Sequence, residues 1–291
     1  MRIWLTGGSG FVGSHLRAVF EARGAEVAAP TRADVDVTDP AAVAASAEAF
    51  APDALVHGAI LNDLTKLGGR EAWDAYVGAT RNVVDAAAGA QVILISTDWV
   101  FDGTQAPASE DTPPNPVNAY GFLKAACELV VEERAARGAV ARISAVQGAH
   151  RAKRRQDHGF GYFVASLVES LRAGEPFTVW EADDINMRAT PTLATDAADL
   201  ILRMIERRRT GIHHCCGGES VTRAELAHAA VRAFDLDGDL LRFGPPEQPP
   251  GAPVPYDTSL DATATAAALD AELPGVSEQL GRLREELCVT T

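Results

Sequence analysis

The chain has 291 residues, of which 47% are hydrophobic, 6% aromatic and 23% charged, as in an ordinary globular protein. This composition excludes a disordered, collagen-like or coiled-coil chain, and the length suffices for one domain with an added lobe or for two modest domains. Lysine and arginine total 26 against 40 aspartates and glutamates, a formal net charge of -14 that argues against general binding to nucleic acid or anionic lipid.

The first half of the chain alternates predicted strands with predicted helices. Each strand is a short β-rich or apolar run, and each helix carries apolar residues at helical spacing. The expected strands are Arg2–Thr6, Glu26–Ala29, Ala54–His57, Gln91–Ser96 and Val140–Ile143, and the expected helices are Phe11–Arg23, 40–50, Arg70–Ala88 and Asn118–Arg137. This alternation predicts an α/β fold with a Rossmann-type, doubly wound parallel sheet that helices cover on both faces.

After about Val146 the alternation loosens, which indicates a second lobe. We expect residues 1–150 to form a dinucleotide-binding domain, with a return segment near 189–213, and residues 151–291 to form a smaller α/β substrate-binding lobe. The proline-rich stretch Gly244–Pro255 should have no regular structure. The helices expected in this half are Gly161–Ala173, Thr195–Arg208, Thr222–Phe234 and Val276–Leu287.

A glycine motif directly follows the first strand. Residues 6–13 read TGGSGFVG, which fits both G-x-x-G-x-x-G and G-x-G-x-x-G, and a helix follows. Backbone N–H groups at a helix start can face a pyrophosphate, and glycines allow its close approach. The alternative is a tight turn that binds no ligand. We expect a dinucleotide cofactor to contact Gly7, Gly10, Phe11, Val12 and Gly13.

The choice of cofactor depends on the stretch PTRAD at residues 30–34, about 20 residues after the motif. Arg32 can offer bidentate donors to the 2′-phosphate of NADP, while Asp34 is near enough to serve NAD. A solvated loop arginine is the alternative interpretation of Arg32. We expect NADP, with NAD as the alternative.

A tyrosine and a lysine at spacing i, i+4 share one face near the start of a predicted helix. An ammonium group near a phenol favours the phenolate, so Lys124 should bring Tyr120 toward the range useful for proton transfer. Thr97 stands at the carboxyl end of a buried strand, where ligands of α/β sheets bind. Its hydroxyl can hydrogen-bond a substrate carbonyl, so these three residues form a candidate catalytic set.

These motifs identify a resemblance to a known family. The chain resembles the extended short-chain dehydrogenase/reductases over nearly its full length, and most closely the dTDP-4-dehydrorhamnose reductase branch. The stretches that carry the resemblance are Thr6–Gly13, Asp36–Asp39, Ser96–Gly103, Asn115–Gly121 with Lys124 and Glu128, and Pro191–Thr192.

The resemblance implies roles for particular residues. Tyr120 would be the proton donor, Lys124 its activator and a contact of the nicotinamide ribose, and Thr97 the residue that orients the carbonyl. Asp36 and Val37 would lie beside the adenine.

Three single positions depart from the family pattern. Trp99 stands where the family usually has tyrosine, Ala145 where this branch often has tryptophan, and Tyr76 where the superfamily tends to have asparagine. We expect Trp99 and Ala145 to line the substrate pocket and to change which sugar fits.

Two groups of cations are candidates for binding phosphate. The run RAKRR at residues 151–155 looks like an insertion, and it is either a solvated loop or a grip for the diphosphate of a nucleotide sugar. Arg188, by resemblance to nucleotide-sugar enzymes, is either a second phosphate contact or part of a surface salt bridge.

The resulting functional hypothesis is NAD(P)H-dependent reduction of a 4-keto nucleotide sugar. The alternatives are an NAD-dependent nucleotide-sugar epimerase or dehydratase and a non-catalytic NAD(P)-binding regulatory subunit. We also expect a homodimer and no partnership with nucleic acid or membrane.

The remaining signals concern location and metals. Apolar runs such as Val92–Ile95 are far shorter than the ~20 residues that cross a bilayer, and residues 1–5 leave no room for a signal peptide, so we expect a cytoplasmic protein.

The four cysteines form no C-x-x-C pair, which predicts buried thiols. In the run HHCC at 213–216, alternate strand residues face opposite sides, so we expect no metal site.

Overall fold

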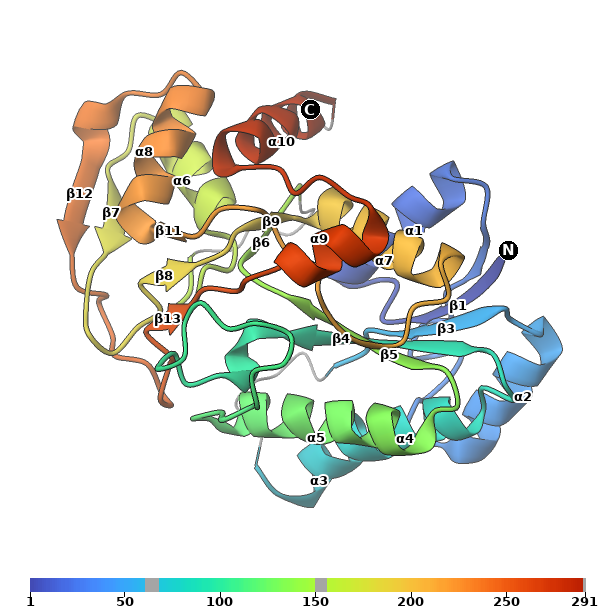
Figure 1. Ribbon diagram of the computed structural model, residues 1–291. Coiled ribbons are helices and arrows are strands. Elements are labelled where there is room, and N and C mark those ends of the chain that lie inside the picture. Colours follow the sequence, from blue (N-terminus) through green and yellow to red (C-terminus); the bar gives the residue numbers. More distant parts are fainter. Residues whose placement is uncertain (61–67, 150–155, 290–291) are drawn as a thin grey trace.

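A six-stranded parallel sheet forms the centre of the larger part of the molecule in the computed structural model, which describes residues 1–60, 68–149 and 156–289 (Figure 1). The strands are β1 (Arg2–Thr6), β2 (Glu26–Ala28), β3 (Ala54–His57), β4 (Gln91–Thr97), β5 (Gly138–Ile143) and β10 (Gly211–His214). Their order is β10-β5-β4-β3-β1-β2, and every neighbouring pair is parallel. The predicted doubly wound sheet is therefore confirmed.

Helices cover both faces of this sheet. In the view of Figure 1, α1 (Phe11–Ala22) and α7 (Ala194–Glu206) lie above it, and α2 (Pro40–Phe50), α4 (Ala79–Asp85) and α5 (Ala119–Arg134) lie below it. Side chains of β1 alternate between the two layers, because successive strand residues point to opposite faces.

The apolar layers follow this alternation along the strands. Ile3 and Leu5 pack with α1 and α7, while Trp4 packs on the other side with the layer of α2 and α4. All seven residues of β4 are buried, as expected for a strand that is covered on both faces. The sheet therefore supplies a rigid base at whose carboxyl end polar side chains can be fixed.

The single helix predicted over Arg70–Ala88 is wrong in detail. The chain forms α3 (Gly69–Trp73), then a π-helical segment η2 (Asp74–Gly78), then α4. π-Helical segments are rare and often occur at functional sites. This one carries Tyr76, whose carbonyl accepts a hydrogen bond from the Thr80 hydroxyl at 2.8 Å.

A second lobe has its own hydrophobic core, separate from the two layers of the large sheet. Its helices are α6 (Phe163–Arg172), α8 (Arg223–Ala233) and α10 (Val276–Val289). Its strands are short, and they are β7 (Phe177–Trp180) paired with β12 (Leu241–Gly244), and β11 (Val221–Thr222), β8 (Arg188–Ala189) and β13 (Asp257–Thr258) in one small sheet. The smaller α/β lobe is thus present, while the division at residue 150 stays a prediction.

Two strands and a helix of the second half are among the elements that were not predicted. The strands β7 and β12 have four residues each and pair only with one another. They are stabilised by a contact between distant parts of the chain, which the local sequence does not reveal. The third element is α9 (Thr263–Leu269), a short alanine-rich helix. Gly244 ends β12, and the rest of the stretch 244–255 is irregular, as expected.

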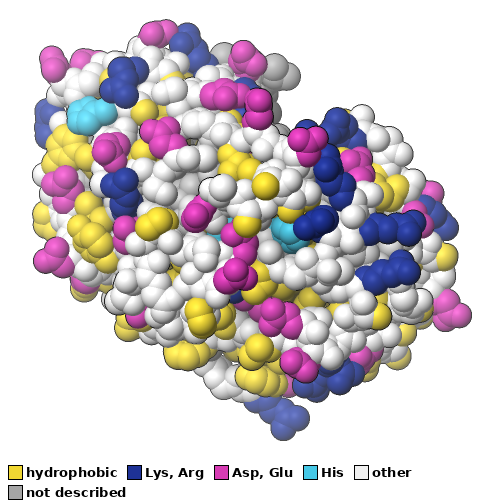
Figure 2. Space-filling view, in the orientation of Figure 1, with side chains coloured by type: hydrophobic (Ala, Val, Ile, Leu, Met, Phe, Trp, Pro, Cys, Tyr) yellow, Lys and Arg dark blue, Asp and Glu magenta, His cyan; other side chains and the backbone are white. Residues whose placement is uncertain are grey.

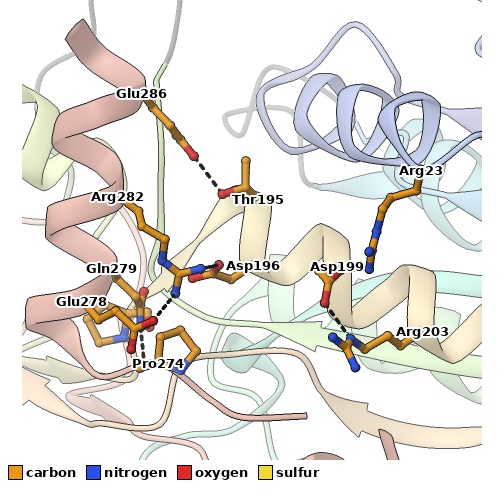
Figure 3. Close-up of polar contacts among 11 residues, drawn as sticks. Arg23, Thr195, Asp196, Asp199, Arg203, Pro274, Glu278, Gln279, Arg282 and Glu286 are labelled. Atoms are coloured by element: carbon orange, nitrogen blue, oxygen red, sulfur yellow. Dashed lines mark hydrogen bonds and ion pairs between the residues drawn. The ribbon is translucent and has the colours of Figure 1, made fainter. Parts of the chain in front are cut away.

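The two lobes are joined where the chain crosses between them. β6 (Val146–Gln147) pairs in parallel with β9 (Thr192–Leu193), and α7 and β10 then return the chain to the large sheet. Helix α10 is fixed to α7 by polar contacts, among them Arg282 to Asp196 at 2.5 Å and Thr195 to Glu286 at 2.8 Å (Figure 3).

The surface and the thiols add further facts. On the face shown in Figure 2, acidic side chains are spread over both lobes with basic side chains among them. Cys127, Cys215 and Cys216 are buried free thiols, as predicted. Within the described ranges no helix has the length and apolar character needed to span a membrane.

Candidate active site

The glycine motif forms a tight turn between β1 and α1. Gly10 is the N-cap residue of α1, and neither a side-chain cap nor an acidic residue occupies the first turn of the helix. The N–H of Gly10 donates to the carbonyl of Gly7 at 2.9 Å, which closes the turn. The positive end of the helix dipole therefore lies at this turn, where an anionic ligand is favoured.

Two of the glycines are required by close approach of backbone to backbone. Gly7 has φ of +74°, and a Cβ atom there would lie 2.7 Å from the carbonyl carbon of Gly58. A Cβ atom on Gly13 would lie 2.1 Å from the carbonyl oxygen of Gly7. A dinucleotide needs the same kind of bare backbone cradle, so the residues present fit such a cofactor.

Arg32 lines a surface pocket of about 580 Å³ together with Thr38 and Asn82. The pocket lies next to the Asp36–Val37 pair. The Val37 carbonyl accepts a hydrogen bond from Asn82 at 3.0 Å. The Asp36 carboxylate accepts from the N–H and hydroxyl of Thr38, and these bonds lower its pKa.

The Asp34 carboxylate, the alternative contact for NAD, is engaged locally. It accepts hydrogen bonds from the N–H of Thr31 at 2.9 Å and from its hydroxyl at 2.7 Å. These two bonds lower the pKa of Asp34. Of residues 30–34, Arg32 is the one that lines the pocket, whose lining also includes the carboxylates of Glu71 and Asp74.

Tyr120 and Thr97 meet at the carboxyl end of β4. Thr97 is the last residue of that strand, and its hydroxyl lies close enough to the Tyr120 side chain, in the first turn of α5, to act on the pKa of the phenol. Asn118 caps α5 by accepting from the N–H of Gly121 at 2.9 Å. A Cβ atom on Gly121 would lie 2.2 Å from the carbonyl oxygen of Trp99, so the helix starts directly against the segment that follows β4.

Lys124 lies one turn further along α5 and is only 4% exposed. Its ammonium group donates to the carbonyl of Ile95 at 2.5 Å, and burial lowers its pKa. The i, i+4 spacing thus places this cation in the interior, anchored to the same strand that carries Thr97.

The expected lowering of the Tyr120 pKa is wrong for this arrangement. Burial raises the pKa of Tyr120 to about 12, and the negative charge of Asp98 acts in the same direction. A phenol in this environment stays protonated at neutral pH. Tyr120 is therefore suited to donate a proton rather than to accept one.

Aromatic rings surround the Tyr120 side chain. The rings of Trp99 and Tyr76 approach it edge-on, with centroids at 6.2 and 6.3 Å. A Cβ atom on Gly159 of the second lobe would lie 3.0 Å from Cζ2 of the indole. Trp99 is thus the point at which the second lobe meets the candidate catalytic residues.

Gly159 belongs to a loop that a buried arginine holds. Arg223, at the start of α8, donates from Nε to the carbonyl of Asn186 at 2.7 Å and from Nη2 to the carbonyls of Asp157, at 3.0 Å, and Gly159. Its guanidinium also lies 4.9 Å from the centre of the Phe160 ring. The wall behind Trp99 is therefore fixed from within the second lobe.

The remaining predicted substrate residues lie elsewhere in the second lobe. Ala145 packs against that lobe's core in a left-handed conformation, with φ of +43°, where a larger side chain would be strained. Arg188 donates to the carbonyl of Ser220 at 3.0 Å and lies 3.9 Å from the Glu225 carboxylate. The basic run 151–155 lies outside the described residues.

The two cysteines of the HHCC run have different surroundings. Cys215 and Cys216 pack in different apolar clusters, which agrees with strand-like alternation. Nowhere in residues 1–60, 68–149 and 156–289 do three or more His, Cys, Asp or Glu side chains form a group that could hold a metal ion.

A buried ionic cluster beneath Lys124 was not predicted. Arg142 of β5 is fully buried and contacts both oxygens of Glu128 on α5, at 3.1 and 2.7 Å. Ser96 donates to the same carboxylate at 2.5 Å. The one available signal was that an arginine interrupts an otherwise apolar strand, which indicates a buried partner.

A family model and several known proteins match nearly the whole chain. The family model described as RmlD substrate binding domain matches residues 1–288. Methionine adenosyltransferase 2 subunit beta of Xenopus tropicalis is 30% identical over 279 residues, 90% of this chain and 80% of that protein. The dTDP-4-keto-6-deoxy-D-glucose reductase of Streptomyces niveus is 29% identical over 255 residues, 84% of this chain and 83% of that protein.

A solved structure shows the same fold. The dTDP-4-dehydrorhamnose reductase of Bacillus anthracis, crystallised in complex with NADP, is similar with a TM-score of 0.85 at 21% identity. The match covers 98% of this chain and 99% of that chain. Both lobes are therefore shared, since nearly all residues of each chain align.

Proposed function

Because the chain belongs to the RmlD substrate binding domain family, we propose that it is an NAD(P)H-dependent reductase of a 4-keto nucleotide sugar. The observation that carries this proposal is the grouping of three side chains at the end of β4, where Tyr120 lies close to Thr97 and Lys124 is buried one turn further along the same helix. This end of the sheet is also where the glycine turn leaves β1. A ligand held by the turn would have its far end beside Tyr120.

The cofactor and four parts of the site would have separate roles in such a reduction. The cofactor supplies the hydride when it is bound. The start of α1 would hold the pyrophosphate, and Arg32 would contact an adenosine 2′-phosphate. Thr97 orients the carbonyl, and Tyr120 donates its proton to the carbonyl oxygen as negative charge develops there.

Lys124 completes the proton transfer. Once Tyr120 has donated, a phenolate remains in a buried site, where an unpaired charge is costly. The ammonium of Lys124 on the same helix face stabilises that phenolate until solvent reprotonates it. This role agrees with a phenol that is protonated at rest and charged only after transfer.

The substrate wall would be formed at the junction of the lobes. Trp99, backed by Gly159, would contact the sugar, and Arg188 remains a candidate for its phosphates. A changed wall contact alters discrimination by about 1–3 kcal/mol, so we propose that the preferred sugar is not dTDP-4-dehydrorhamnose.

The test of the reductase proposal is Tyr120→Phe, assayed for NAD(P)H oxidation against a panel of nucleotide 4-keto sugars. Loss of general acid catalysis should lower kcat by roughly 10²-fold, with cofactor affinity unchanged. Tyr256→Phe, at an exposed position in the second lobe, is the matched control. A Phe variant with wild-type turnover would contradict the role of Tyr120.

The cofactor preference is tested by Arg32→Ala. Only NADPH carries the 2′-phosphate, so the variant should weaken NADPH binding about tenfold or more and change NADH binding little. Fluorescence titration of both nucleotides measures the two affinities. Equal losses would show that Arg32 does not contact the phosphate.

A second candidate function is a subunit of a larger enzyme. It is favoured by the 30% identity to a protein named methionine adenosyltransferase 2 subunit beta. Sedimentation of this chain mixed with methionine adenosyltransferase from the same source would reveal a complex. Because Tyr120 is interior to the site, Tyr120→Phe should leave such a complex intact while abolishing reduction.

A further inference from the structure

One face of α5 carries three polar side chains, of which the proposed reaction uses two. Tyr120, Lys124 and Glu128 follow one another at intervals of four residues, so they lie along one side of the helix. Lys124 and Glu128 are both buried, at 4% and 2% exposed. Glu128 has no part in the proton transfer, so its burial beside the site needs another explanation.

Two polar contacts join this face to neighbouring residues of β4. The ammonium of Lys124 donates to the carbonyl of Ile95 at 2.5 Å, and the hydroxyl of Ser96 donates to Oε1 of Glu128 at 2.5 Å. Ile95 and Ser96 directly precede Thr97 in the strand. Because the contacts lie one helical turn apart on α5, they limit both the sliding and the rotation of the helix against the end of the strand.

The carboxylate of Glu128 is itself held in place by Arg142 of β5. The guanidinium donates from Nε to Oε1 at 3.1 Å and from Nη2 to Oε2 at 2.7 Å. Its Nη1 atom lies 3.5 Å from Nε2 of His214, on the neighbouring strand β10. A carboxylate bound through both oxygens has a fixed orientation, so Ser96 meets an acceptor that cannot turn away.

An ion pair is not needed merely to pack α5 on the sheet. Leu123 and Cys127 of α5 already share a hydrophobic cluster with Val92 and Leu94 of β4. Replacing a buried ion pair by apolar side chains of similar size is often neutral or stabilising. What the carboxylate of Glu128 adds is a fixed hydrogen-bond acceptor for the residue that precedes Thr97.

We propose that Glu128, held by Arg142, is a positioning residue that anchors Ser96 and thereby fixes Tyr120 and Lys124 of α5 against the end of the strand that carries Thr97. Its effect on catalysis rests on the proposed function, because a misplacement of catalytic groups by about 1 Å can cost about 10²-fold in rate. Its effect on the helix does not depend on that function.

The test uses Ser96→Ala, which removes the hydroxyl and leaves the Arg142–Glu128 pair intact. Hydrogen–deuterium exchange of the cofactor-free protein, followed by mass spectrometry, measures local opening of each helix. Because α5 loses one of its two polar contacts with β4, the backbone N–H groups of residues 119–128 should exchange about tenfold faster. Those of α2 should exchange as in the wild type.

Ser46→Ala is the matched control, because it also removes one hydroxyl that joins a helix to a strand. Ser46 of α2 accepts from Nε1 of Trp4 in β1 at 3.1 Å. This variant should leave the exchange of α5 unchanged. Wild-type exchange of α5 in Ser96→Ala would overturn the proposal, and so would an equal acceleration in α2 and α5, which would indicate a general loss of stability.

A second variant removes the acceptor instead of the donor. Glu128→Leu combined with Arg142→Met leaves an apolar pair of similar size and no unpaired charge. The exchange of α5 should again be faster than in the wild type. Wild-type exchange in this double variant would overturn the proposal, because apolar packing would then suffice to hold the helix.

A kinetic readout separates this inference from the function on which it rests. With an active substrate, Ser96→Ala should lower kcat about tenfold and leave KM for the sugar unchanged, since binding of the substrate is not the step affected. A wild-type kcat would overturn the proposal. Failure of the wild type to reduce any nucleotide sugar would contradict the proposed function instead, since hydrogen exchange needs no substrate.

Discussion

Two groups of ion pairs in the molecule balance charge differently. The cluster beneath Lys124 joins Arg142 to Glu128, and the seam is the row of ion pairs along α7 that runs from Asp196, beneath α10, to Asp199, beside α1. In the first, Arg142 and Glu128 are buried together and meet through two hydrogen bonds. The Phe101 ring lies 4.9 Å from the guanidinium carbon. One cation faces one anion there, so the pair is neutral as a unit.

At the seam, the guanidinium of Arg282 contacts two carboxylates (Figure 3). Arg282 contacts Asp196 at 2.5 Å and Glu278 at 3.4 Å. Burial raises the pKa of Asp196 to about 6 although Arg282 opposes the rise, and Glu286 adds to it. The shorter contact thus belongs to a carboxyl with a raised pKa, which teaches that burial, with the neighbouring carboxylates adding to it, can outweigh a close guanidinium.

The largest expected effect on stability comes from removing one partner of the Arg142–Glu128 pair. Glu128→Ala leaves Arg142 charged and unpaired in the interior, which should lower the free energy of unfolding by about 3–5 kcal/mol. Urea denaturation measures the loss. Glu133→Ala, an exposed glutamate of the same helix, should change stability by less than about 0.5 kcal/mol.

A double variant sharpens this result. Combining Glu128→Leu with Arg142→Met removes both charges, so most of the lost stability should return. A double variant as unstable as Glu128→Ala would show that the loss is one of packing, and the comparison with the seam would fail.

An intermediate effect is expected at Asp196, as a dependence of stability on pH. Its pKa is higher in the folded chain than the usual value of an unfolded aspartate, so the protonated form stabilises the fold. That contribution is complete below about pH 4 and is lost as the pH rises through about 6. Relative to the wild type, Asp196→Asn should therefore gain about 1–2 kcal/mol between pH 4 and pH 7.

Thermal unfolding of both proteins at several pH values measures this difference. The comparison between variants cancels the carboxylates with lowered pKa values, such as Asp36 and Glu225, which favour the fold at higher pH. A difference in stability between Asp196→Asn and the wild type that stays constant with pH would contradict a raised pKa of Asp196 in the folded chain.

The smallest effect is expected at the outer end of the seam. Asp199 contacts Arg203 at 2.7 Å and Arg23 at 2.6 Å, but all three side chains are about a third exposed or more. Asp199→Ala should lower stability by at most about 1 kcal/mol, and the effect should shrink in high salt. Melting temperatures at low and high ionic strength check it, and a loss that salt leaves unchanged would argue against an electrostatic origin.

The sequence predicts the sheet and its helices because their signals are local. The buried run Gln91–Thr97 and the capped helix at Asn118 carry their own patterns of burial and capping. The strands Phe177–Trp180 and Leu241–Gly244 do not, since each is stabilised by a partner far away in the chain. The π-helical segment at Tyr76 was missed because helical periodicity does not distinguish it from an α-helix.

The candidate site also has one part that the sequence predicts and one part that it does not. Tyr120 and Lys124 have a helical spacing that implies proximity, and the place of Thr97 at a strand end predicted that it lies near them, as it does for Tyr120. The partner of Asp98 could not be predicted, because Ser144, whose hydroxyl donates to the carboxyl, lies on a different part of the chain with no motif that connects the two.

The place of β10 in the large sheet has a consequence for synthesis on the ribosome. The strand β5 pairs with β10 along one edge, and β10 ends only at His214. Until that residue has emerged, the nascent chain exposes β5 as an open edge, which is a site for unwanted pairing with other chains. A nascent chain stopped before Gly211 should therefore depend on chaperones, and one that extends through the strand should be released from them.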